Sequence, residues 1–298
     1  MVRFSEISKI YGEIKALDEV SFEIPKNTIV GLVGPNGAGK STCMKIMAGA
    51  MAATSGELFI DDQKIESYSP DAWKKQVGFL PERPPVYEEL SVVENLSFWA
   101  DVFSIKNKKQ KISNLIDKTG LSSVVRKPGG SLSKGYRQRL GIAKALISEP
   151  ELLILDEPLS GLDPMQLDEI RKLIRDLGKE HSVLFSSHQL HELEQVCDYY
   201  VFLNEGKLVS SGTSEQIKNQ SEEPWLCVEF FNEIAQYPDF GKPTRNLKKD
   251  SFEIQIQEEA GASEQILNWS RKQNLSIKKM IWQKPDLEQI FRDLNSNR

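Results

Sequence analysis

Residues that could hold phosphate groups are concentrated in residues 31–42, which read GLVGPNGAGKST. The pattern Gly-x-x-x-x-Gly-Lys-Ser runs from Gly34 to Ser41. Glycines let a loop take backbone conformations closed to other residues, so that successive N–H groups can point at phosphate oxygens. In such a loop the lysine reaches the β- and γ-phosphates, and the serine hydroxyl ligates Mg²⁺. We therefore predict a nucleotide-binding loop whose contacts come from Gly34, Asn36, Gly37, Gly39, Lys40, Ser41 and Thr42.

The flanking residues supply the elements that a phosphate-binding loop requires. Residues 28–33 form a short apolar run rich in β-formers, which predicts a buried strand. A helix is expected to begin near Lys40, and its positive N-terminal end would add to the same anion site. The order strand, glycine loop, helix separates this stretch from an ordinary glycine-rich turn.

A second set of reactive residues follows two apolar runs later in the chain. Residues 152–155 are Leu-Leu-Ile-Leu, which is typical of a strand covered on both faces, and Asp156 and Glu157 come directly after them. Ligands of open α/β sheets bind at that end of the strands. We predict that Asp156 holds Mg²⁺ through water and that Glu157 orients and polarises the attacking water. His188 follows the apolar run 182–186, so it is expected at the same edge, although a lone histidine is usually structural.

Two further positions are suggestive without being decisive. Ser133 can cap a helix whose apolar residues recur at helical spacing, and this gives another N-terminus, near Gly135, that attracts anions. Many helices begin in this way, so the pattern is weak when taken alone. Tyr11 precedes a glycine at the end of a short strand, where its ring could stack on adenine or simply pack at a turn.

Composition restricts the class of protein. The chain has 298 residues, of which 39% are hydrophobic and 27% charged, an ordinary globular balance. It has no apolar stretch near the ~18 residues that span a bilayer and no signal-peptide pattern, so we expect a cytoplasmic protein. Its three cysteines lack metal-like spacing and are interpreted as reduced thiols. The net charge of −5 weighs against a nucleic-acid partner.

The chain is predicted to contain two domains. Residues 1–218 form the main domain, and a polar segment ending at Pro224 marks the boundary. Residues 225–298 are expected to form a small α+β domain, with strands near 226–231, 252–257 and 276–282 and a helix over 263–274. A last amphipathic helix is expected from the spacing of Leu287, Ile290, Phe291 and Leu294.

The motifs GPNGAGKST, LSKGYRQR, LLILDEP, SGLD and SSH, in this order, resemble those of the nucleotide-binding subunit of an ATP-binding cassette (ABC) transporter. The resemblance covers roughly residues 1–218. It implies an α/β P-loop NTPase cassette with a mixed sheet core, an antiparallel β layer and a helical subdomain at about residues 85–150. It also implies that Tyr11 stacks on adenine, that Ser133 and Gly135 reach the γ-phosphate of a second protomer's nucleotide, and that His188 contacts the same phosphate.

The same resemblance implies cofactors and partners. ATP and Mg²⁺ would be shared between two copies of the chain, or between this chain and a related ATPase, at the inner face of the cell membrane. A separate transmembrane permease would complete the transporter, and the closing PDLEQIF is similar to the tail of export subunits. The alternative is a soluble ABC ATPase acting on a non-transport macromolecule. Such proteins normally carry tandem cassettes or a long heptad insertion, and the sequence shows neither.

The chain departs from the family pattern at two sites. The family's signature Ser-Gly-Gly-Gln has Lys134 and Tyr136 at its second and fourth positions here. The glutamine that usually follows the Leu-Pro strand end is Glu82. The resemblance places this side chain beside Mg²⁺ and the attacking water, and a carboxylate is a suitable Mg²⁺ ligand. Glu82 is therefore predicted to be both a metal ligand and a catalytic residue; the alternative is a tolerated substitution in a solvated loop.

Overall fold

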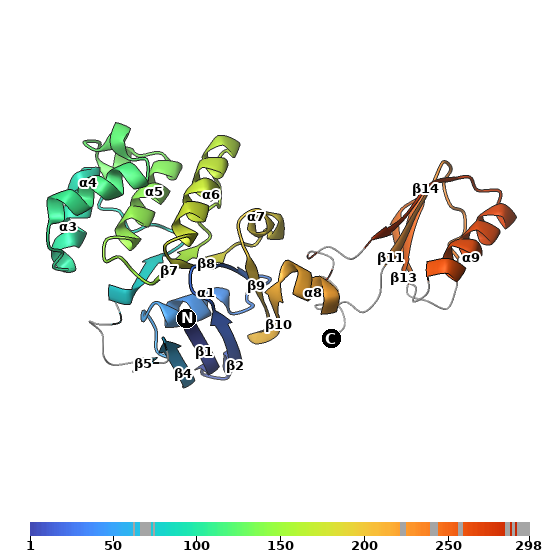
Figure 1. Cartoon of the computed structure of the whole chain (residues 1–298), viewed down its shortest axis with the longest axis horizontal. Coiled ribbons are helices and arrows are strands. Elements are labelled where there is room, and N and C mark those ends of the chain that lie inside the picture. Colours follow the sequence, from blue (N-terminus) through green and yellow to red (C-terminus); the bar gives the residue numbers. More distant parts are fainter. Residues whose placement is uncertain are drawn as a thin grey trace. The chain divides into compact units, whose positions relative to one another are not determined.

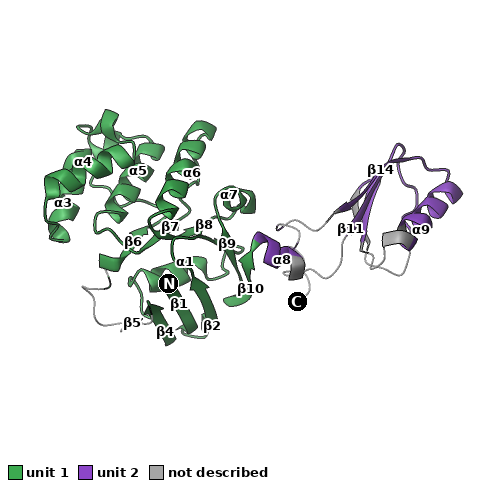
Figure 2. Cartoon of the chain, viewed as in Figure 1, with its two compact units in different colours: residues 1–213 green, residues 214–298 purple. Residues whose placement is uncertain are grey.

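The structure is a computed structural model that describes residues 1–61, 63–65, 73, 75–220, 225–238, 244–255, 259–283, 287 and 290. The chain forms two compact units, residues 1–213 and 214–298 (Figure 2). Helix α8 (Ser214–Gln220), most of which we expected to close the main domain, falls in the second unit. No helix among the residues described is long and apolar enough to cross a membrane.

An antiparallel sheet forms one layer of the first unit (Figure 1). Its strand order is β2 (Ile14–Ile24), β1 (Val2–Tyr11), β4 (Ser55–Ile60) and β5 (Gln63–Ile65). Val20, Phe22 and Ile24 are buried and the residues between them are exposed, the period-2 alternation of a strand with one covered face. The buried face packs against α1 (Lys40–Met47) in a common apolar core.

The second sheet carries the ends of strands that hold the predicted site residues. Its order is β10 (Lys207–Thr213), β9 (Tyr199–Asn204), β3 (Ile29–Val33), β8 (Ser182–Ser186), β7 (Leu152–Asp156) and β6 (Val77–Leu80). All neighbouring pairs are parallel except β9 and β10. Every residue of β3, β7 and β8 is buried, as expected for strands covered on both faces. The predicted mixed sheet is confirmed.

A group of helices lies to one side of the sheets (Figure 1). It contains α3 (Val92–Val102), α4 (Lys108–Lys118) and α5 (Lys134–Ala145), with short 3₁₀ turns at Ser122–Val124 and Gly129–Ser131. Ser91 and Glu94 form a capping box at the start of α3. Two more helices, α6 (Pro164–Gly178) and α7 (Leu190–Glu194), follow β7 and β8.

Besides α8, the described residues of the second unit form a four-stranded sheet and a longer helix, α9. The order is β12 (Thr244–Lys248), β13 (Ser251–Gln255), β11 (Trp225–Phe230) and β14 (Ile277–Gln283), and α9 spans Glu259–Lys272. Its core includes Leu226, Val228, Phe230, Phe252, Ile254 and Ile266. Helix α9 begins at Glu259, earlier than the predicted residue 263. Most of the predicted last helix lies outside the described residues, although Leu287 and Ile290 are buried.

Candidate nucleotide-binding site

The loop between β3 and α1 has the backbone that phosphate binding requires. Gly37 and Gly39 have φ values of 84° and 100°, in the left-handed region that favours glycine. Gly34 is needed for a different reason, because a Cβ built on it would lie 2.5 Å from the Leu203 carbonyl oxygen. Gly39 is the N-cap of α1, and no side chain caps this end. The first N–H groups of the helix are therefore open to an anion.

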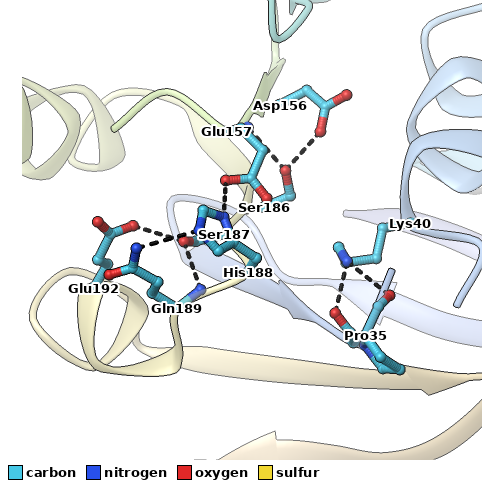
Figure 3. Close-up of polar contacts among 10 residues, drawn as sticks. Pro35, Lys40, Asp156, Glu157, Ser186, Ser187, His188, Gln189 and Glu192 are labelled. Carbon is cyan, nitrogen blue, oxygen red and sulfur yellow. Dashed lines mark hydrogen bonds and ion pairs between the residues drawn. The ribbon is translucent and has the colours of Figure 1, made fainter. Parts of the chain in front are cut away.

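Lys40 places a buried cation at this loop. Its side chain is only 8% exposed, and Nζ donates to the carbonyl oxygens of Gly34 at 2.6 Å and Pro35 at 3.1 Å (Figure 3). Burial lowers the pKa of Lys40, whereas the charges of Glu157 and Asp156 act in the opposite direction. In the part of the chain that the structure describes, no carboxylate forms an ion pair with this ammonium. The loop thus holds a largely buried positive charge that forms no ion pair with a carboxylate of the described residues.

A hydrogen-bonded set of side chains stands at the ends of β7 and β8 (Figure 3). Ser186 Oγ donates to Asp156 Oδ1 at 2.7 Å and accepts the Glu157 N–H at 2.9 Å. His188 Nδ1 lies 2.9 Å from Glu157 Oε2. Glu157 itself has a φ of 50°, a strained conformation for a residue other than glycine, which costs on the order of 1 kcal/mol and is typical of functional sites. Burial raises the pKa of the Glu157 carboxyl, while the hydrogen bond and charge of His188 lower it.

These groups surround one cleft of about 420 Å³. The parallel register explains how they meet, because Leu32 and Asp156 both pair with Ser186 at the same edge of the sheet. The predicted residues that line the cleft are Asn36, Gly37, Gly39, Lys40, Ser41, Thr42, Glu82, Asp156, Glu157 and His188. The lining residues that we did not predict are Ala16, Ala38 and Ser160.

Comparison with known proteins identifies this arrangement. Residues 17–160 match the sequence model of the family described as ABC transporter. The ABC transporter ATP-binding protein YxlF of Bacillus subtilis (strain 168) is 36% identical over 225 residues, 74% of this chain and 74% of that protein. The chain belongs to the ABC transporter family. It is an ATP-binding subunit of an ABC transporter and an ATPase, as the motifs indicated.

Two further comparisons agree with this assignment. The lantibiotic transport ATP-binding protein SrtF of Streptococcus pyogenes is 35% identical over 223 residues, 74% of this chain and 95% of that protein. A solved structure of the ATP-binding subunit of an ABC transporter matches with a TM-score of 0.67 and 29% identity, covering 74% of this chain and 93% of that one. The predicted ABC cassette fold is confirmed.

Four predicted ATP contacts of this ABC subunit do not line the cleft of their own chain. Tyr11 is 45% exposed, and its hydroxyl donates to Met51 Sδ at 2.7 Å. Ser133 caps α5 as predicted, accepting the Tyr136 N–H at 3.4 Å, and Gly135 lies in the first turn of that helix. Gly34 also lies outside the lining, where its carbonyl holds Lys40. The roles of Tyr11, Ser133 and Gly135 toward a nucleotide stay predictions.

The predicted Mg²⁺ ligands Ser41, Asp156 and Glu82 line the cleft together. A hydroxyl and carboxylates are donors that suit Mg²⁺, which usually keeps several waters and binds substrate phosphates. Within the described residues, no group of three or more His, Cys, Asp or Glu side chains is arranged to hold a metal alone. The donor set therefore fits a metal that arrives with a nucleotide and takes part of its coordination from the phosphates.

Ser186 is the functional residue that sequence reasoning missed. It lies in the SSH motif, next to the predicted His188, but its role is visible only once β7 and β8 are paired. Its hydroxyl is fully buried and joins the carboxylate of Asp156 to the backbone of Glu157. Ser187 has a related supporting role, since its Oγ donates to Glu192 Oε2 at 2.6 Å and accepts the Gln189 N–H at 3.0 Å.

Proposed function

We propose that this ABC subunit hydrolyses ATP with Mg²⁺ to drive export through a separate transmembrane permease. It would act at the inner face of the membrane, as a homodimer or with a related ATPase chain. The direction of transport rests on the closing PDLEQIF and on the similarity to SrtF, whose name assigns it to lantibiotic transport. The observation that carries the catalytic part is the buried Lys40 ammonium, which lies in the same cleft as Glu157 and His188 and whose hydrogen-bond partners among the described residues are carbonyls.

The chemistry follows from these contacts. A buried charge without a counter-ion is costly, and phosphate oxygens would compensate the ammonium of Lys40. ATP supplies the transferable phosphoryl group, and Mg²⁺ offsets its negative charge. Asp156, fixed by Ser186, is placed to hold the metal through water. Glu157 would orient the attacking water, and His188, which contacts its carboxylate, would hold that carboxylate in position and contact the γ-phosphate.

We also propose separate roles for the two parts of the chain. Residues 1–218 would form the ATPase domain, with a helical subdomain at about 85–150, and residues 225–298 would form an accessory α+β domain. The first unit contains every residue that lines the cleft described above. The second unit has its own apolar core, which supports its treatment as a domain.

An exposed apolar patch at the loop between β6 and α3, the loop that contains Glu82, suits a membrane subunit. We define it by Tyr87, Phe98 and Val102, which are 43%, 41% and 54% exposed. The rings of Tyr87 and Phe98 lie 4.8 Å apart in an edge-to-face contact. The patch is anchored because the Asn95 side chain hydrogen-bonds both the N–H and the carbonyl of Tyr87. A grouped apolar surface of this kind is a marker of a protein interface, and we propose that the permease binds here.

Co-purification tests this proposal. Phe98→Ser should lower the amount of co-purified polytopic membrane protein by about tenfold or more, because exposed aromatic anchors dominate interface energies. Phe231→Ser is the matched control, since Phe231 is 69% exposed but lies in the second unit. ATP binding by the isolated chain should be unchanged in both. Equal recovery of the membrane protein with Phe98→Ser and with wild type would contradict the proposed interface.

A separate prediction concerns Glu82 and the dependence of ATP affinity on Mg²⁺. Its carboxylate lines the cleft, where it would repel the γ-phosphate unless Mg²⁺ lies between them. Glu82→Gln should therefore raise ATP affinity in the presence of chelator by about fivefold and reduce the gain that Mg²⁺ brings. Titration of a fluorescent ATP analogue with and without Mg²⁺ measures both effects. Glu89→Gln, an exposed carboxylate of the same loop that does not line the cleft, is the control. The same Mg²⁺ dependence in Glu82→Gln and wild type would exclude a metal-linked role.

A further inference from the structure

Lys134 lies against the loop that follows Glu157. It is the first residue of α5, its side chain is exposed, and it stands where the family signature has a glycine. A Cβ built on Gly161 would lie 2.4 Å from Lys134 Nζ and 3.5 Å from its Cε. Gly161 also has a φ of 65°, in the left-handed region. The end of the lysine side chain therefore lies over Gly161, close to where a side chain of residue 161 would begin.

A second contact runs from α6 to α5, where the Gln166 side chain lies against Gly135. A Cβ built on Gly135 would lie 2.6 Å from Gln166 Oε1 and 2.8 Å from Gln166 Cδ. Gln166 is fixed in the first turn of α6, where its N–H donates to the Asp163 Oδ1 cap at 2.9 Å. The first turn of α5 and the segment that leads into α6 thus contact each other through two side chains. Lys134 packs on Gly161, and Gln166 packs on Gly135.

Farther along, an ion pair holds the same two helices together. Arg139 Nη2 lies 2.6 Å from Glu169 Oε2, and Arg139 Nη1 donates to the Thr119 carbonyl at 2.8 Å. Figure 1 shows α5 and α6 as neighbours in the first unit. Because this pair limits how the helices can slide, the contact between Lys134 and Gly161 has a defined geometry.

The loop that Lys134 touches is short and connected to the catalytic glutamate. The Ser160 N–H donates to the Glu157 carbonyl at 3.2 Å, and Leu159 is buried. Glu157 keeps a strained backbone, with a φ of 50°, and such conformations persist only where the surroundings enforce them. Ser186 and His188 hold Glu157 from one side. The other side, residues 158–163, is supported by the contact with Lys134.

We propose that Lys134 is a positioning residue that sets the orientation of Glu157 in its own chain by packing on Gly161. This inference rests on the proposed role of Glu157. Lys134 has no ion pair among the described residues, so its effect comes from the volume of its side chain and not from a partner charge. A glycine at position 134, as in the family signature, could not make this contact.

The test is steady-state ATP hydrolysis by the full chain. Lys134→Ala should lower kcat by about tenfold to a hundredfold, because a small misplacement of a catalytic group has effects of this size. KM for ATP should stay within about twofold, since Lys134 does not line the nucleotide cleft of its own chain and the inference assigns it no contact with the nucleotide of a second protomer. Lys134→Met retains a long unbranched side chain and should restore most of the lost kcat. Lys109→Ala, an exposed lysine on α4, is the control and should behave as wild type.

A double variant tests the contact itself. Gly161→Ala should lower kcat, because the added methyl group displaces Lys134 and strains a left-handed residue. The variant Lys134→Ala/Gly161→Ala should have a kcat no lower than that of Gly161→Ala alone. If the two residues acted independently, the fold-reductions in kcat of the two single variants would multiply. Thermal unfolding of Lys134→Ala should remain within about 2 °C of wild type, as for an ordinary surface change.

Three results would overturn the inference. They are an unchanged kcat in Lys134→Ala, a raised KM with normal kcat, and a Lys134→Met variant as impaired as Lys134→Ala. The first denies a positioning role, the second indicates a nucleotide ligand, and the third indicates a role for the charge. Failure of the proposed function is distinguishable, since it would appear as a wild-type chain whose hydrolysis does not depend on Glu157.

Discussion

Glu157→Gln is expected to reduce ATP hydrolysis by about 10²- to 10⁴-fold while leaving Mg-ATP binding intact. Glutamine has the size of glutamate, but it cannot polarise water or accept its proton. The residue lines the cleft and contacts His188, whereas the predicted phosphate contacts come from the glycine loop. Phosphate release measures turnover, and equilibrium binding of labelled ATP measures affinity. ATP binding would still bring two chains together, but the variant could not hydrolyse the ATP and so separate them again. A stable ATP-bound dimer should therefore accumulate, and size-exclusion chromatography would detect it.

Lys40→Ala is the contrasting control. Lys40 is buried at the loop, and its ammonium has only carbonyl partners among the described residues. Its removal should abolish ATP binding as well as hydrolysis, because the phosphates lose their main charge partner. An equal loss of ATP affinity in Glu157→Gln and Lys40→Ala would show that Glu157 is a nucleotide ligand and not the residue that orients water.

The main features of the cleft could be predicted because most of its residues lie in local sequence patterns. Apolar runs fix β3, β7 and β8 as buried strands, and parallel pairing then brings their carboxyl ends to one edge. Lys40, Asp156 and His188 each follow such a run directly or through the glycine loop. Their convergence therefore follows from strand order alone, without knowledge of any side-chain packing.

Contacts between distant segments could not be predicted. Ala16 comes from the antiparallel layer, and nothing in its sequence neighbourhood indicates that it lines the cleft. The pairing of Ser186 with Asp156 depends on the register of β7 with β8. The packing of Lys134 on Gly161 depends on how α5 lies along α6. Such contacts are set by tertiary packing, which periodicity within one segment does not report.

Helix boundaries show the same limitation in the second unit. We expected α9 to span residues 263–274. The helix instead begins at Glu259 and passes through Gly261. A glycine in a helix costs about 1 kcal/mol, a penalty that packing of the buried face, including Ile266, can outweigh.

Mixing two inactive chains is expected to restore ATP hydrolysis if the sites are shared between protomers. Ser133 and Gly135 lie outside the cleft of their own chain, and the family resemblance assigns them to a second protomer's γ-phosphate. Ser133→Arg removes the α5 cap and fills that surface, so the variant alone should be inactive. In a dimer with Lys40→Ala, one site combines the intact Lys40 of one chain with the intact Ser133 of the other. Random pairing at equal amounts gives about a quarter of the wild-type number of sites.

A second mixture separates shared sites from other causes of recovery. Lys40 and Glu157 line the same cleft of one chain, so Lys40→Ala mixed with Glu157→Gln leaves each site of the mixed dimer with one defect. This mixture should stay inactive under conditions in which Lys40→Ala with Ser133→Arg recovers. Phosphate release, with subunit exchange followed by fluorescence, measures both mixtures. Full activity of Ser133→Arg alone, in a chain that light scattering shows to be monomeric, would refute sharing, because the γ-phosphate would then need nothing from a second copy.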